Sequence, residues 1–221
     1  MQSPVLYPSN AQIELFSKLS PILGVNPTVS NFIDDFGSCN LDILRCADAE
    51  DANVSFYASL GLMGYNVNGG CYEIVMGGHR QFPDIEAVVA SCAFFVIRDK
   101  WDCSIGNVFE SVIELYYPKA AMKHVMFYYP YLWHNKLSSL KVVNYPVKVM
   151  LGIPISQSEL NYKRQYVPRL GRPFRPGRHQ HLRHQPQAGD ITATRTDANA
   201  QTATQTAREG HPHRAPRASR P

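Results

Sequence analysis

The sequence predicts an α+β (mixed α/β) fold, with a mainly antiparallel sheet and helices packed on it. Three observations support this prediction. Short runs of β-forming residues separated by polar turns fill residues 41–78. An amphipathic helical pattern begins at Pro83, and further β-like runs lie between residues 108 and 154. We therefore expect one domain over residues 40–166, a helical lead-in over residues 1–39 and a separate tail over residues 167–221.

The segment 41–78 is predicted to form three strands. Ile43-Leu44 leads into an acidic turn, Val54–Leu60 alternates, and Tyr72–Met76 is rich in β-forming residues. Between the last two runs, Asn68-Gly69-Gly70 tolerates the positive φ angles that a tight hairpin needs. Together these runs indicate half of an antiparallel sheet.

Two helices are predicted in the first hundred residues. Residues 11–19 (AQIELFSKL) form a short amphipathic pattern after Asn10, which suits an N-cap. The stronger helix starts at Pro83, and its apolar residues recur at spacings of three and four up to Val96. One face of this second helix is therefore expected to be buried, and a loop should follow at Trp101–Gly106.

The rest of the body is predicted to be mostly strand. Val108–Tyr116 and Val125–Tyr131 are β-like, and Pro130 in the second run favours a strand end or an edge position. The alternation after Pro146 predicts a strand that ends at Pro154.

A terminal helix should follow that strand. Ser156-Gln157-Ser158-Glu159 has the capping-box spacing, in which a serine hydroxyl and a glutamate satisfy free amides at a helix start. The helix that this box opens covers Leu160–Tyr166 and runs directly into the tail.

The charge of the chain is divided at Tyr166. Residues 1–166 carry 12 Lys+Arg and 15 Asp+Glu, a net charge of −3, whereas residues 167–221 carry 10 Arg, no Lys and 3 Asp+Glu, a net charge of +7. The tail holds one aromatic residue, Phe174, and has too little apolar surface to fold alone, so it is predicted to be disordered.

Arginine without lysine suggests a GC-rich gene read in the wrong frame. Shifting the tail by one base permits the reading FRALADLFDQADINIFDINRKP over Val167–Gly189, which has a helical pattern and then a β-like run. The alternative is a genuine basic arm that binds nucleic acid, in which case binding should weaken with salt.

The cysteine pattern and the apolar runs favour a cytoplasmic protein. The five cysteines are scattered without a CxxC pair and are expected to be reduced thiols. No signal-peptide pattern is present, and the longest apolar run, Ala87–Ile97, is too short to span a membrane.

The order and spacing of several short strings resemble the suppressor-of-fused (SUFU) family. In the first half they are DIL at 42–44, FYAS at 56–59, GL at 61–62 and YEIVMGG at 72–78. The second half adds GHRQF, IGNVFE, KHVMFYYPYLW and LGIPISQSEL. The resemblance covers residues 40–166 and implies a SUFU-like domain that binds other proteins. In bacterial-type members it implies an immunity role, with a toxin encoded nearby as the partner.

The resemblance also implies candidate partner-binding residues. Family members add a partner peptide partly as an extra strand, and animal members line the peptide cleft with the helix end and a Gly-Asp turn. The matching positions here are Phe95 and Gly106-Asn107, where asparagine replaces the aspartate and removes a charge.

The aromatic run Phe127–Trp133 adds three further candidates for binding. Tyr and Trp dominate interface hot spots, so Tyr129, Tyr131 and Trp133 are included in the predicted site. The alternative is that alternate members of this run fill the core.

Catalytic, cofactor and metal sites are not predicted. A small hydrolase that pairs Cys103 or a serine with His79 or His124 stays open as an alternative, but nothing in their spacing demands it. The sequence has no GxSxG, P-loop or GxGxxG motif, and the His179…His184 cluster lies in the suspect tail.

Overall fold

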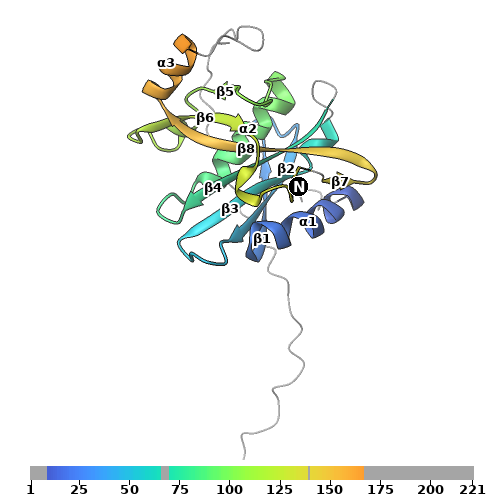
Figure 1. Ribbon diagram of the computed structural model, residues 1–221. Helices are drawn as coiled ribbons and strands as arrows, with labels where there is room; N and C mark the ends of the chain where they lie inside the picture. The colour runs from blue at the N-terminus through green and yellow to red at the C-terminus, as the bar shows by residue number, and fades with distance from the viewer. Residues whose placement is uncertain (1–8, 66–69, 139, 167–221) are drawn as a thin grey trace, which may run out of the picture. The chain divides into compact units, whose positions relative to one another are not determined.

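A computed structural model describes residues 9–65, 70–138 and 140–166 (Figure 1). The described part is an eight-stranded sheet with three α-helices and three short 3₁₀ turns, η1 to η3. The helices are α1 (Asn10–Leu23), α2 (Ile85–Asp99) and α3 (Gln157–Tyr166), and the 3₁₀ turns are η1 (Leu62–Tyr65), η2 (Ile113–Leu115) and η3 (Tyr131–Trp133). The strands are β1 (Val25–Ile33), β2 (Asn40–Ala47), β3 (Val54–Leu60), β4 (Cys71–His79), β5 (Val108–Phe109), β6 (Met122–Tyr128), β7 (Lys141–Val142) and β8 (Tyr145–Ser156).

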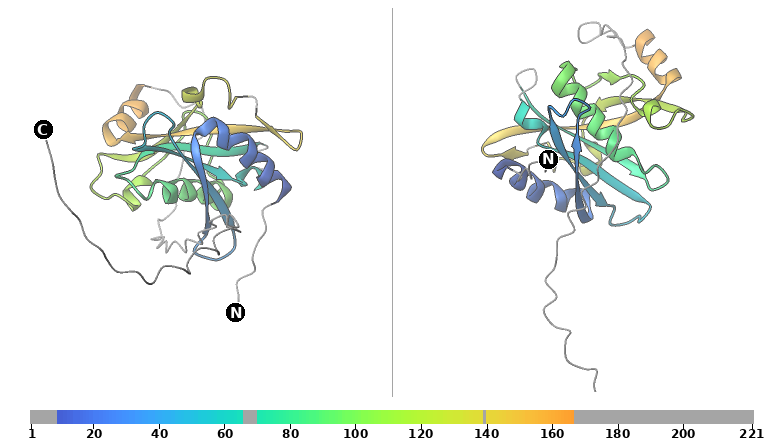
Figure 2. Two further views of the ribbon diagram at one scale, coloured as in Figure 1. Left: turned by 90° about the horizontal axis from the view of Figure 1, so that it is seen from below. Right: turned by 180° about the vertical axis from the view of Figure 1, so that it is seen from behind.

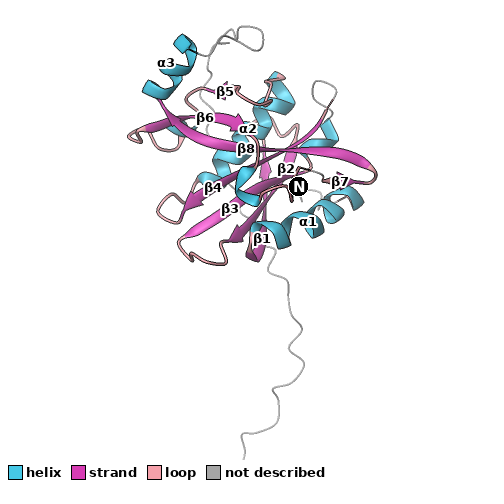
Figure 3. Cartoon of the chain, viewed as in Figure 1, coloured by secondary structure: helices cyan, strands magenta, loops and turns pink. Residues whose placement is uncertain are grey.

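The sheet order is β1-β2-β3-β4-β8-β6-β5, and β7 pairs with β8 outside this path. All neighbouring pairs are antiparallel except β4 and β8, which are parallel. Strand β8 is the long strand that links the two halves of the sheet, and α3 follows directly at its end (Figures 2 and 3). The mainly antiparallel α+β fold predicted from the sequence is confirmed.

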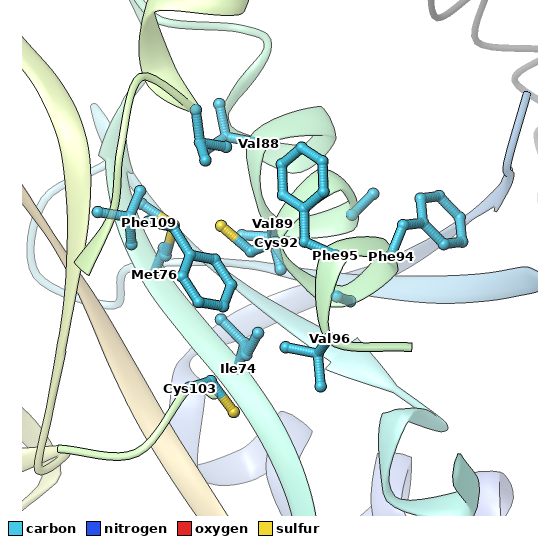
Figure 4. Packing of buried hydrophobic residues seen from close by; sticks show 14 of the residues in the cluster. Ile74, Met76, Val88, Val89, Cys92, Phe94, Phe95, Val96, Cys103 and Phe109 are labelled. Atoms are coloured by element: carbon cyan, nitrogen blue, oxygen red, sulfur yellow. The ribbon is translucent and has the colours of Figure 1, made fainter. Parts of the chain in front are cut away.

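Two apolar layers lie on opposite faces of the sheet, because successive strand residues point to opposite sides. Ile43, Tyr57, Ile74 and Met76 pack with α2, which is apolar nearly all round. Figure 4 shows Ile74 and Met76 beside the apolar side chains of this helix. The neighbouring strand residues Leu44, Ala58 and Val75 belong to the other layer, with Leu15, Leu19 and Leu23 of α1.

The N-terminal segment contains a strand that the sequence analysis did not predict. Helix α1 is longer than expected and starts after Ser9 rather than Asn10, with a capping box between Ser9 and Gln12. Residues 25–33 of the expected helical lead-in form β1, which pairs with β2 along most of its length. This segment is therefore part of the sheet, and the sheet begins before residue 40.

The middle of the chain departs from the predicted strands in two places. The predicted run Val108–Tyr116 is a strand only at Val108–Phe109, because Ser111 takes a left-handed φ of 61° and the chain turns into η2. The connection from β3 to β4 runs over residues 61–70 and includes η1, so it is longer than a tight hairpin. Asn68 and Gly69 of the predicted turn lie outside the described residues.

The end of the described chain agrees with the predicted capping box. The amide of Glu159 donates to Ser156 Oγ at 3.3 Å, and the amide of Ser156 donates to Glu159 Oε2 at 2.7 Å. The tail over residues 167–221, predicted to be disordered and either frameshifted or basic, lies outside the described residues. Within the described ranges, no helix is long and apolar enough to cross a membrane.

Candidate partner-binding surface

The end of β6 carries a group of exposed aromatic side chains. Tyr128, Tyr129, Tyr131 and Leu132 are 43%, 59%, 55% and 50% exposed. We call these four residues the tyrosine surface. Single exposed apolar residues are common in proteins, but four within five consecutive positions form a patch that is typical of an interaction site.

The backbone of this segment is bent tightly and partly strained. The amide of Tyr131 donates to the carbonyl of Tyr129 at 2.8 Å, and the amide of His134 donates to the carbonyl of Tyr131 at 3.0 Å. His134 itself has φ 51° and ψ −128°, a backbone conformation that residues other than glycine rarely adopt. Such conformations persist only where the surroundings hold them, and they gather at functional sites.

The Gly106-Asn107 turn lies beside the start of the tyrosine surface. The Gly106 amide donates to the carbonyl of Phe127 at 2.8 Å, and the Phe127 amide donates to the carbonyl of Asn107 at 2.9 Å. Ile105, which is 38% exposed, precedes this turn. Gly106 has φ +82°, and a Cβ there would meet open space, so its glycine serves the backbone conformation of the turn.

Phe95 lies in the core beneath this region. It is 7% exposed and stacks on Trp101 at 4.5 Å between ring centroids. Trp101 packs edge-on against Phe109 at 4.9 Å, and Phe109 packs against Phe127 at 4.6 Å. Figure 4 shows Phe95 and Phe109 within this apolar cluster. A chain of rings therefore connects α2 to the strand that carries the tyrosine surface.

Trp133 lies on the other side of the sheet. It is 7% exposed, belongs to the layer that contains α1, and packs edge-on against Phe56 at 5.0 Å. Of the six residues predicted from the sequence, Gly106, Asn107, Tyr129 and Tyr131 thus lie around the end of β6. Phe95 and Trp133 are buried in opposite layers.

Three residues of this region were not singled out from the sequence. Tyr128 and Leu132 lie in the predicted aromatic run, but which of its members face outward depends on where the strand ends. Ile105 lies in a predicted loop whose position beside β6 results from a pairing between distant residues. Only the backbone geometry brings these side chains to the site.

The residues of the alternative hydrolase site are either buried or already engaged in hydrogen bonds. Cys103 is 1% exposed, and burial raises the pKa of its thiol to about 12, with Asp102 adding a smaller effect (Figure 4). The Ser111 amide donates to His124 Nδ1 at 2.9 Å, so Nε2 carries the proton that is shared with Gln157 Oε1 at 3.2 Å. Exposed His79 accepts from the Gln81 amide at 3.2 Å. Within the described ranges no hydrogen bond joins Cys103 to either histidine.

A hollow of about 200 Å³ lies between the start of α1 and η1, lined by residues that include Gln12, Leu41 and Tyr65. It is smaller than typical ligand pockets, which are roughly 300–1,000 Å³, and no Cys or His lines it. No three His, Cys, Asp or Glu residues gather as a metal site in the part of the chain that the structure describes.

Comparisons with known proteins agree on one family. A family model described as "Suppressor of fused protein (SUFU)" matches residues 37–171. The immunity protein YqcF of Bacillus subtilis (strain 168) is 34% identical over 143 residues, which cover 62% of this chain and 74% of YqcF. The crystal structure of a putative SUFU homolog from Neisseria gonorrhoeae FA 1090 aligns with a TM-score of 0.53 at 13% identity, over 71% of this chain and 81% of that one. At this identity the structural likeness bears on the fold alone.

Proposed function

Because the chain belongs to the suppressor of fused protein (SUFU) family, we propose that it is a protein-binding domain of the immunity type. In this role it binds a toxin protein and neutralises it. The relative YqcF, which is named an immunity protein, supports the immunity type. The partner is expected to be a toxin domain encoded near this chain's own gene.

The observation that carries the proposal is the tyrosine surface. Its aromatic side chains are exposed, yet the bent segment that presents them is fixed by backbone hydrogen bonds and by Trp133 in the core. Tyrosines bury a large area at a low entropic cost when they already sit on a rigid backbone, and they are enriched among interface hot spots. We propose that Tyr129 and Tyr131 contact the partner directly, with the Gly106-Asn107 turn at the margin.

Phe95 and Trp133 have a different role in this proposal. Both are buried, so we assign them to holding the surface in place rather than to contact with the partner. The charge balance of residues 1–166, a net −3, favours a basic partner, although the field of three charges is weak.

We also propose that binding, and not catalysis, neutralises the toxin. A nucleophilic cysteine needs a lowered pKa and a base within hydrogen-bond reach. The buried thiol of Cys103 has a raised pKa instead, and both nitrogens of His124 are engaged with Ser111 and Gln157. Nucleic-acid binding by residues 167–221 stays a separate prediction, which salt-dependent binding of the full chain to RNA or DNA would test.

The test is protection from a toxin in a growing host. The full chain is co-expressed with the toxin-like protein encoded beside its gene, and survival and co-purification are both measured. We expect near-stoichiometric co-purification and full protection. A double variant, Tyr129→Ala with Tyr131→Ala, should lose both co-purification and protection.

A matched control is available on α3. Tyr162 and Tyr166 are 63% and 59% exposed and contact each other at 4.7 Å between ring centroids. Replacing both by alanine removes the same chemistry from a different element and should leave protection unchanged. Equal effects of the two double variants would contradict the proposed surface, and no protection by the unaltered chain would contradict the immunity role.

A further inference from the structure

We infer that the tyrosine surface receives a positively charged side chain, arginine or lysine, from the protein that it binds. This inference rests on the proposed function, because it names the chemistry of the partner at that same surface. It depends on the arrangement of three rings, on the absence of a cation over them among the described residues, and on the net charge of the domain.

The three tyrosine rings are arranged around Tyr128. Its ring is nearly perpendicular to that of Tyr129, at 79° and 5.5 Å between centroids, and to that of Tyr131, at 71° and 6.4 Å. In an edge-on pair the rim of one ring covers one face of its neighbour, and the exposure of all three rings leaves other negative faces open to a further group. A cation is attracted when it lies within about 6 Å of a ring centroid, and tyrosine is among the better rings. This spacing therefore suits a guanidinium or ammonium group.

The chain places its own cations over other aromatic rings. Arg45 lies 6.0 Å from the centroid of Tyr57, Arg98 lies 5.6 Å from Phe36, and Lys148 lies 5.5 Å from Tyr72. In the described ranges, no Arg or Lys lies over Tyr128, Tyr129 or Tyr131, although these are exposed. The described residues thus leave these faces available to a cation from another molecule.

The net charge of the domain favours a cation. Asp102 is exposed in the loop that leads to the Gly106-Asn107 turn, and among the described residues its oxygens accept only from the amide and hydroxyl of Ser104. In the described part of the chain Asp102 has no ion pair. Lys136 is the lysine nearest in sequence to the tyrosine surface, and Lys100 precedes Asp102 by two residues, whereas residues 1–166 as a whole carry a net −3. The partner group with complementary charge is therefore basic.

Arginine is expected to bind better than lysine. Its planar guanidinium stacks on aromatic faces and is more weakly hydrated than an ammonium group, so less solvation is lost on contact. At an exposed site each ring should contribute about two- to fivefold in affinity.

The experiment uses short peptides as probes for the full chain. Three acetylated and amidated (Gly-Xaa)₃ peptides, with arginine, lysine or citrulline at Xaa, are titrated while the tyrosine ring NMR signals are followed. Citrulline has the shape of arginine without its charge. We expect saturable shifts of the Tyr128, Tyr129 and Tyr131 rings in the order arginine, lysine, citrulline, and smaller shifts at Tyr162 and Tyr166.

Variants separate the ring faces from simple apolar contact. Tyr129→Phe with Tyr131→Phe keeps both faces and should keep affinity for the arginine peptide within about twofold, whereas the corresponding double leucine variant should lose about tenfold. Equal binding of the citrulline peptide, or undiminished binding by the leucine variant, would overturn the inference.

The toxin assay distinguishes this inference from the proposed function. If the leucine variant loses protection while the arginine peptide never shifts the three rings, the immunity role stands and the cation site is wrong. If the arginine peptide binds as expected while the unaltered chain protects from no toxin, the cation site stands and the immunity role is wrong.

Discussion

Phe95 of α2 stacks on Trp101 with 4.5 Å between the ring centroids and 23° between the ring planes. The resemblance predicts Phe95 to be a partner-binding residue, whereas its burial favours a supporting role. We predict that Phe95→Leu lowers the free energy of unfolding by about 1–2 kcal/mol, because an aromatic pair is lost and the volume is roughly kept. Partner affinity should stay within about twofold.

Urea unfolding and partner titration of the same samples check this prediction. Phe82→Leu is a suitable control, because Phe82 is 38% exposed and pairs edge-on with Tyr117 at 5.4 Å. Phe82→Leu should lower the free energy of unfolding by less than Phe95→Leu does. A loss of partner affinity without a loss of stability would make Phe95 a contact residue after all.

Glu73 gives the protein a pH-dependent stability. Its side chain is fully buried and accepts hydrogen bonds from Ser59 Oγ and from the amides of Gly61 and Met63 at 3.0 and 3.1 Å. Burial raises the pKa of Glu73 from 4.5 to about 7, although these hydrogen bonds oppose the shift. Between those two values the unfolded chain has released the proton and the folded chain still holds it.

The free energy of unfolding should therefore fall as pH rises from about 4.5 to about 7, by up to about 3 kcal/mol from this residue alone, and then level off. Glu73→Gln lacks the titrating group. Urea unfolding of both proteins at a series of pH values isolates the effect, because all other groups cancel in the difference. Parallel curves for the two proteins would show that Glu73 does not titrate in this range.

His124, in strand β6, links helix α3 to the sheet. It accepts from the Ser111 amide and contacts Gln157, the first residue of α3, while being 2% exposed. We predict that His124→Leu costs about 1–3 kcal/mol of unfolding free energy, because the partly buried Ser111 amide loses its acceptor. Amide exchange in α3 should become faster than in α2.

His79→Leu is the control for that experiment, because His79 is exposed and, among the described residues, its side chain accepts only from the nearby Gln81 amide. Hydrogen exchange measured by mass spectrometry resolves the two helices. If α3 keeps its protection in His124→Leu, its attachment depends on its other contacts, buried Leu160 and the Arg164–Glu110 ion pair.

Val143 should be a site where a substitution stabilises the protein. It has φ 47° at the tip of the β7–β8 hairpin, followed by Asn144 at φ 65°, and its side chain is 48% exposed. A β-branched residue is strained in the left-handed region, by about 1–2 kcal/mol, whereas asparagine tolerates it. Val143→Asn should therefore raise the free energy of unfolding by about 1 kcal/mol.

Thermal unfolding of Val143→Asn, with Tyr145→Asn as the control, tests that prediction. Tyr145 is 63% exposed in the adjoining strand β8. Tyr145→Asn should lower the stability of the protein, since asparagine is unfavourable in a strand. A lower melting temperature for Val143→Asn would show that the valine makes a favourable contact at the tip.

The elements that could be predicted from the sequence are those whose own residues carry a clear pattern. The run Val54–Leu60 forms β3 over the same residues, the helix after Pro83 forms α2, and the capping box at Ser156 opens α3. Strand β1 gave no such signal, because its side chains are exposed or half-buried along an edge and Asn26-Pro27 interrupts its start. The parallel pairing of β4 with β8 joins distant segments and has no local signature.

The candidate site could be predicted only in part for a similar reason. The aromatic run was recognised, but Phe127 and Trp133 face the core while Tyr129 and Tyr131 face outward. The alternation that would assign these faces ends with β6, before the bend at Pro130. The resemblance placed Phe95 and Gly106 at one site, and only packing distinguishes the buried ring from the exposed turn.

Strand β8 also determines when a newly synthesised chain becomes able to bind. A chain growing on the ribosome can pair β1 to β4 early, since those strands are neighbours in sequence. Strand β6 is held in the sheet by β8, through pairs from Met122↔Ser156 to Tyr128↔Leu151. A nascent chain that already contains every tyrosine of the surface thus lacks the strand that fixes their backbone. We expect each molecule to gain its protective capacity in one step, once Ser156 has left the exit tunnel.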